Sequence, residues 1–160
     1  MKTLKVLFIL CIMLGFAITA NSQGKQVVRP MKGTFYELPS GIPGTSFVTG
    51  QVTHMGNITG TSIADMSGAK QIGNVITGVK NYKTKIAANG DKIFSEASVT
   101  LILNLDVNGK PDGTGTFYAT AIEVGGTGRF EGCSGELYVT GTFNNITGCK
   151  NYTAEGWIKY

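Results

Sequence analysis

The sequence contains few of the residues from which catalytic and metal sites are usually built. Its 160 residues include one histidine, three cysteines and ten acidic side chains, and 15% of the residues are charged. A zinc site needs three or four converging ligands, and a serine triad needs a histidine beside an activated serine. No nucleophile-elbow motif accompanies His54, so we predict no triad, no metal site and no cofactor. Instead, we expect the His54 ring to cap a strand end by hydrogen bonding to backbone.

Runs of basic residues are also missing, and basic and aromatic residues are not interleaved. The formal net charge is +4, from 14 basic and 10 acidic residues. Two of the basic residues, Lys2 and Lys5, lie in the first 22 residues; without that segment the charge is 12 − 10 = +2. Nucleic acid is therefore not a predicted partner.

The only long apolar run lies at the N-terminus. Lys2 and Lys5 precede an uninterrupted apolar stretch over residues 6–17, and the small residues Ala20 and Ser22 follow it. This arrangement is typical of a secretory signal peptide, and the stretch is shorter than the roughly 20 residues that span a bilayer. We predict cleavage after Ser22, leaving a single domain over residues 23–160. That domain would be secreted or periplasmic and would have no transmembrane segment.

Helical periodicity is absent after this segment, whereas alternation with a period of two is frequent. In residues 98–107, apolar side chains recur at every second position: Val99, Leu101, Leu103, Leu105 and Val107. Such a pattern predicts a half-buried strand, and similar runs occupy residues 116–124, 136–143 and 152–160. The dipeptides Asn89-Gly90 and Asn108-Gly109 are typical of tight reversals. We therefore predict an all-β fold, a single antiparallel closed β-barrel of about eight strands, since closure removes exposed edges. Cys133 and Cys149 flank one such strand, so we expect two unpaired thiols.

A glycine-rich segment, GGTGRFEGCSGE over residues 125–136, is best explained as a corner of the backbone. It superficially resembles a dinucleotide-binding loop, but that motif requires a following helix, and here a strand follows. Glycines permit a compact corner, with Phe130 plugging the barrel end and Arg129 and Glu131 in water. The residues predicted to define this corner are Gly126, Gly128, Arg129, Phe130, Gly132 and Gly135.

Three segments resemble the allene oxide cyclase and dirigent type of β-barrel, in its uncharacterised exported bacterial branch. They are GGTGRFEGCSGELYVTGTF (125–143) followed by YTAEGWIKY, VTHMGNITGT (52–61) and AANGDKIF (87–94), in the expected order. The chain departs from that pattern at Cys133, where alanine is usual, and at Met55, where leucine is usual. The resemblance implies a calycin-like barrel, export and self-association as a homo-oligomer. The catalytic acids of that superfamily do not map by motif onto this sequence.

Two classes of function stay open at this point. The first is a non-enzymatic barrel that binds a small apolar ligand or has a structural or interaction role at the cell envelope. The second, implied by the resemblance, is a cyclase or isomerase acting in the barrel mouth. An inward Glu96 would be a carboxylate of raised pKa in an apolar cavity, whereas a bulge near residues 97–98 would turn it outward. The candidate ligand-binding residues are His54, Glu96, Tyr118, Tyr138 and Trp157.

Overall fold

The computed structural model describes residues 26–160, and these form nine antiparallel strands. In chain order they are β1 (Val28–Pro39), β2 (Thr45–Val52), β3 (Gly56–Asp65), β4 (Lys70–Ile72), β5 (Val75–Ala87), β6 (Lys92–Leu105), β7 (Pro111–Gly126), β8 (Ser134–Asn144) and β9 (Cys149–Lys159). A short 3-10 turn, η1 (Gly128–Phe130), precedes β8. The predicted signal peptide, residues 1–22, and the start of the predicted domain lie outside the described residues. Within residues 26–160, no helix is long and apolar enough to cross a membrane.

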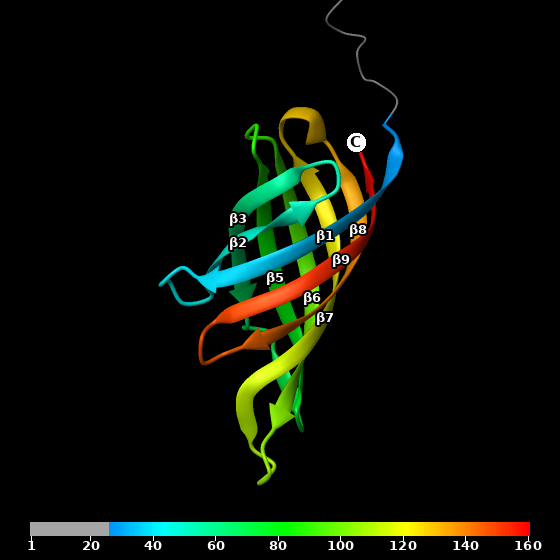
Figure 1. Cartoon of the computed structure of the whole chain (residues 1–160). Coiled ribbons are helices and arrows are strands. Elements are labelled where there is room, and N and C mark those ends of the chain that lie inside the picture. Colours follow the sequence, from blue (N-terminus) through cyan, green and yellow to red (C-terminus); the bar gives the residue numbers. More distant parts are fainter. Residues whose placement is uncertain (1–25) are drawn as a thin grey trace, which may run out of the picture.

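Eight of the strands close into a barrel, which confirms the predicted fold. The hydrogen-bonded order is β1-β2-β3-β5-β6-β7-β8-β9, and β9 pairs with β1 to complete the ring. The additional strand, β4, pairs only with β5 and stays outside the ring. Figure 1 shows the strongly tilted strands wrapping around one interior. This closure leaves no ring strand with an unpaired edge.

Alternation along β6 places one face in the interior. Val99, Leu101 and Leu103 line the inside of the barrel, as the pattern predicts. The prediction fails for Leu105 and Val107, which are 48% and 101% exposed. The reason is that β6 ends at Leu105 and the β6–β7 hairpin extends beyond the barrel (Figure 1).

One end of the barrel is closed by apolar side chains that meet beneath η1. Phe130 and Ile93 have no exposed surface, and Met31 and Ile158 are equally buried. The Phe130 ring lies edge-on to Tyr160, with ring centroids 4.9 Å apart. This cluster separates the interior from solvent at the end that contains both chain termini of the barrel.

The glycine-rich corner gives Phe130 its position. Gly128 has a backbone φ of +62°, a conformation that residues other than glycine rarely adopt. A Cβ atom at Gly126 would collide with the Lys92 carbonyl oxygen, so the backbone passes close to β6 only because this residue is glycine. Gly132 and Gly135 follow at the entry to β8. Arg129 stays on the surface, lies 3.6 Å from Asp91 and donates to the carbonyl oxygen of His54.

Candidate functional site

The barrel encloses a cavity of about 270 Å³. One arc of its wall, formed by β6, β7 and β8, is apolar apart from Ser95 on β6. The apolar residues of this arc are Ala97, Val99, Leu101, Leu103, Phe117, Ala119, Ala121, Leu137, Val139 and Phe143. Met66, in the β3–β4 loop, and Asn145, in the β8–β9 turn, also line the cavity. The cavity therefore reaches the end of the barrel that Phe130 does not close.

The other arc is polar and comes from β9, β1 and β5. Its polar members are Glu37, Asn81, Lys83, Lys85, Lys150 and Tyr152. On β5, Lys83 and Lys85 are two residues apart, so both project from the same face of the strand. Lys85 pairs across the sheet with Ile93, which is fully buried, so this face is the interior one. The cavity thus has one apolar side and one ionic side.

Glu37 is the centre of the ionic side. Its side chain is 2% exposed, and its two oxygens accept from three donors. The Lys83 ammonium lies 2.9 Å from Oε1 and the Lys150 ammonium 2.6 Å from Oε2. The Tyr152 hydroxyl donates to Oε1 at 2.9 Å. Burial alone raises the pKa of Glu37, but the ammonium groups of Lys83 and Lys150 outweigh burial and lower the pKa to about 2. Glu37 is therefore ionised at any physiological pH.

A second ion pair lies deeper in the barrel and is complete in itself. The Lys85 ammonium is 2.6 Å from Oε1 of Glu123, and both side chains are nearly inaccessible. The Ser95 hydroxyl donates to the other Glu123 oxygen at 2.8 Å. Because each charge has a close partner of opposite sign, this pair contributes no net charge to the interior.

Lys83 and Tyr152 form the contact between the ionic side and the aromatic rings of the cavity. Lys83 donates to the Tyr152 hydroxyl, and its ammonium lies 4.2 Å from the centroid of the same ring. The Tyr152 ring stacks on Phe35 at 4.8 Å with an interplanar angle of 8°. Burial, followed by the nearby Glu37 charge, raises the pKa of Tyr152, so the phenol keeps its proton. Burial lowers the pKa of Lys83, and Glu37 opposes this effect only in part.

The interior carries one more cation than anion. Among the described residues, the cavity wall and the pair behind it hold three lysines and two glutamates. Since Lys85 and Glu123 neutralise each other, a single carboxylate, Glu37, serves both Lys83 and Lys150. The side chain of Lys150 is 31% exposed, and that of Lys83 is 15% exposed. The more enclosed of the two competing cations is therefore Lys83.

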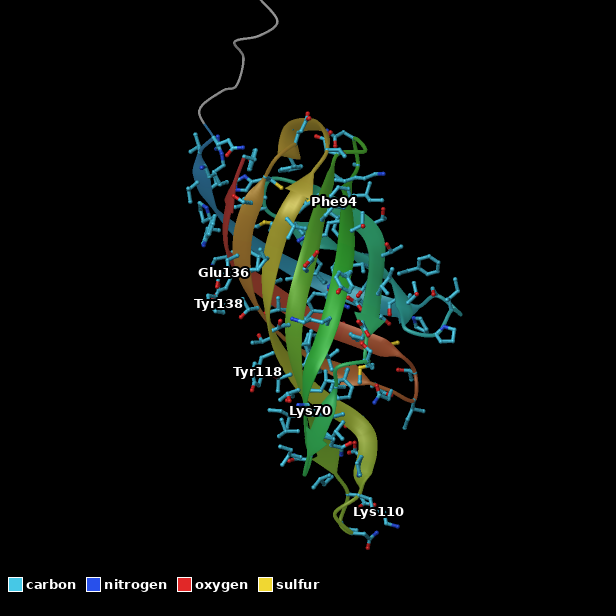
Figure 2. All side chains as sticks on the ribbon, turned by 180° about the vertical axis from the view of Figure 1, so that it is seen from behind. Lys70, Phe94, Lys110, Tyr118, Glu136 and Tyr138 are labelled. Atoms are coloured by element: carbon cyan, nitrogen blue, oxygen red, sulfur yellow. The ribbon has the colours of Figure 1, made fainter. Side chains whose placement is uncertain are left out.

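The residues predicted to bind a ligand lie on the outside of the barrel and not in this cavity. Tyr118, Tyr138 and Trp157 are 52%, 63% and 40% exposed. Figure 2 shows Tyr118 and Tyr138 projecting away from the ribbon on the outer surface. As ligand-binding residues they would have to face the interior, but the inward positions of the same strands belong to Phe117, Ala119 and other residues that alternate with them.

Glu96 is also exposed, although for a simpler reason than the predicted bulge. Ala97 and Val99 line the cavity, so Glu96 faces outward by ordinary alternation along β6. The pairing of β6 with β7 does shift register, but it does so between Phe94 and Ser95. An inward carboxylate exists in the barrel; it is Glu37, which the sequence analysis did not single out.

His54 lies in the turn between β2 and β3, at the closed end of the barrel. Its backbone has φ +68, and its Nε2 atom is 2.9 Å from the carbonyl oxygen of Pro30. Within residues 26–160, no three side chains of His, Cys, Asp or Glu are grouped so as to hold a metal ion. Cys133 and Cys149 are free thiols, as predicted: Cys133 immediately precedes β8, and Cys149 begins β9 after the β8–β9 turn.

Comparison with known proteins gives no relative from which a function could be inferred. No family model, curated protein or solved structure matches the chain.

Proposed function

We propose that this protein binds a small, largely apolar ligand inside its barrel. The observation that carries the proposal is the cavity of about 270 Å³ with one apolar and one ionic side. A dry cavity of about 150 Å³ is large enough to hold benzene. By the same proportion, this cavity suits a molecule of roughly ten to twelve non-hydrogen atoms. Its apolar part would contact Val99, Phe117 and Val139, and a polar group would face Lys83 and Tyr152.

The ionic side argues for a ligand and against a purely structural role. Buried ion pairs are often no more stabilising than apolar residues of similar volume. A barrel that only needed a packed interior would gain little from Glu37 and Lys83. Binding sites, by contrast, are typically apolar with a few convergent polar groups that orient the ligand. A location outside the cytoplasm, from the expected signal peptide, is part of the same proposal, and self-association stays a prediction.

A cyclase or isomerase is the second candidate, and one observation favours it. Glu37 is an acid that converges with Phe35 and Tyr152 on an enclosed cavity. Its low pKa makes it unsuited to donate a proton, and both of its oxygens already accept hydrogen bonds. Proton transfer in such an enzyme would therefore fall to Tyr152 or Lys83. Binding alone requires no such step, so it is the preferred proposal.

The substitution Ala119→Phe is expected to abolish ligand binding by filling the cavity. Ala119 lies on β7 and lines the cavity wall, and the added ring would occupy much of the free space. With 2-naphthalenemethanol as the probe, calorimetric titration should show at least about a tenfold loss of affinity, or ~1.4 kcal/mol. Circular dichroism and thermal unfolding would report that the barrel is still folded.

Thr120→Phe is the matched control, since it adds the same ring one residue along β7. Thr120 is absent from the cavity wall, and it faces the opposite side of the strand. Its affinity for the probe should remain within about twofold of the parent protein. Equal loss in both variants, or no binding of the probe by the parent protein, would refute a ligand site in this cavity.

A further inference from the structure

We propose that Lys83 forms an imine with the carbonyl group of an apolar aldehyde or ketone held in the cavity. This inference rests on the proposed ligand binding and adds the chemical class of the ligand and the atom to which it becomes linked. The site consists of the Lys83 amine, the Tyr152 hydroxyl and the Glu37 carboxylate, which are in mutual contact at the cavity wall.

The charge balance of the interior favours an uncharged amine at one lysine. Three lysines share two carboxylates, so one ammonium has no anion of its own. Holding an uncompensated charge in an enclosed apolar space is costly, and a group in that position tends to neutralise. A lysine that is desolvated beside another cation is the usual form of a nucleophilic lysine amine.

Among the three lysines, Lys83 is the one that can act in this way. Lys85 is engaged by Glu123 at 2.6 Å and is almost fully enclosed. Lys150 is the most exposed of the three, and its ammonium makes the shorter contact with Glu37, 2.6 Å against 2.9 Å. Solvent and Glu37 together stabilise the charge of Lys150. Lys83 is left as the more enclosed of the two lysines that share Glu37, and it lies on the cavity wall against the rings of Phe35 and Tyr152.

The neighbours of Lys83 also suit each step of imine formation. The free amine attacks the carbonyl carbon, a C–N bond forms, and a carbinolamine results. The Tyr152 hydroxyl accepts from Lys83 and donates to Glu37 in the ligand-free protein, and it would redirect its proton from Glu37 to the carbinolamine oxygen. That oxygen leaves as water as the nitrogen lone pair forms the C=N bond, and the proton on nitrogen can return to the phenolate. The sum is amine plus carbonyl giving imine plus water, with no oxidant or reductant required.

The surroundings stabilise the product as well. The imine nitrogen takes up a proton from solvent, as the amine does, and the resulting positive charge can retain the ion pair with Glu37 that the Lys83 ammonium makes. The apolar arc on β6, β7 and β8 shields the C=N bond from the water that would hydrolyse it. Phe35 and Tyr152 stack beside the nitrogen, and their rings favour a cation at 4.2 to 5.7 Å.

The experiment traps the imine with 2-naphthaldehyde as the probe. The folded protein is incubated with the aldehyde at neutral pH, reduced with borohydride, and analysed by intact mass and peptide mapping. We expect one adduct per chain, located at Lys83. Lys80 is an internal control, because it lies on the same strand, is exposed and donates to Ser98. Because Lys83 lines the cavity that holds the aldehyde and Lys80 does not, adduct at Lys83 should exceed adduct at Lys80 by at least about tenfold, equivalent to ~1.4 kcal/mol.

Two variants and one competitor complete the test. Lys83→Arg keeps a cation at the site but cannot form an imine, so it should lose the adduct, whereas Lys80→Arg should retain it. The alcohol 2-naphthalenemethanol should compete with the aldehyde and reduce labelling of the parent protein. Labelling spread over surface lysines, or unaffected by Lys83→Arg, would overturn the proposal. If the alcohol binds but no adduct forms, the imine is refuted and the proposed ligand binding stands; if neither probe binds, both are refuted.

Discussion

Glu37→Gln is expected to lower the free energy of unfolding by about 3–5 kcal/mol at neutral pH. The substitution keeps the shape of the side chain but removes the only carboxylate that serves Lys83 and Lys150. Removing one partner of a buried ion pair leaves the other charge uncompensated, which is the origin of the large cost. Here it removes the one counterion that Lys83 and Lys150 share. Urea denaturation followed by tryptophan fluorescence or circular dichroism would measure the difference.

Glu155→Gln is the control for this prediction. Glu155 lies 3.0 Å from Lys32, but both side chains are about two-thirds exposed, at 67% and 71%. Exposed pairs contribute about 0–1 kcal/mol, so this variant should unfold nearly as the parent does. Similar losses in the two variants would contradict the assignment of Glu37 as the centre of the ionic cluster.

The free energies of unfolding of Glu37→Gln and Glu155→Gln are expected to depend differently on pH. The pKa of Glu37 is lowered from an ordinary value of 4.5 to about 2, so the folded state holds the carboxylate ionised where the unfolded state protonates it. The resulting stability is present in full above about pH 4.5 and is lost as the pH falls towards 2. The shift corresponds to about 3 kcal/mol. The difference between the parent protein and Glu37→Gln should therefore shrink across this window, whereas the Glu155→Gln difference should not.

Phe130→Ala is expected to destabilise the barrel by about 3–5 kcal/mol through the cavity it leaves. Phe130 has no exposed surface and packs against Tyr160 at the closed end. It lies two residues after Gly128, whose backbone is in a left-handed conformation, so the corner has little freedom to collapse around the lost ring. Thermal or urea unfolding would give the magnitude.

Phe47→Ala provides the comparison, because Phe47 is 56% exposed and loses much less contact. Phe47→Ala should change the free energy of unfolding by no more than about 1 kcal/mol. Phe130 does not line the ligand cavity, so Phe130→Ala should still bind 2-naphthalenemethanol where it remains folded. A Phe130→Ala barrel as stable as Phe47→Ala would show that the corner does not close this end.

The fold could be predicted because its determinants are local. Alternation over residues 98–107 indicates a strand, and Asn89-Gly90 and Asn108-Gly109 mark the reversals between strands. The turn at residues 89–90 joins β5 to β6 in the structure, as its sequence predicts. Repeated strands without helices leave few architectures for a chain of this length. Closing the sheet into a barrel pairs the backbone groups of its two edge strands.

The site could not be predicted in the same way, because alternation defines two faces without saying which is inside. On β7, Tyr118, Ile122 and Val124 face outward, whereas Phe117 and the small residues Ala119 and Ala121 face inward. Large apolar residues therefore lie on both faces of β7, and ranking by size and apolarity does not identify the inner face. The small inward alanines are the reason the barrel has a cavity.

The ionic side of the cavity could not be predicted from the sequence for a related reason. On β5, apolarity would place Tyr82 and Ile86 inside, but the register with β6 turns Lys83 and Lys85 inward. Glu37 and Lys150 are 113 residues apart, and only barrel closure between β1 and β9 brings them together. One signal was available: Glu37 follows Phe35 at strand spacing, so the two share a face.

The most direct test of an interior ligand site is a set of intermolecular NOEs to bound 2-naphthalenemethanol in methyl-labelled protein. We expect NOEs from the probe to the inward methyl groups of Ala119, Ala121 and Val139, and none to the outward methyl groups of Ile122 and Val124. NOEs confined to Ile122 and Val124 would place the ligand on the outer surface and contradict an interior site.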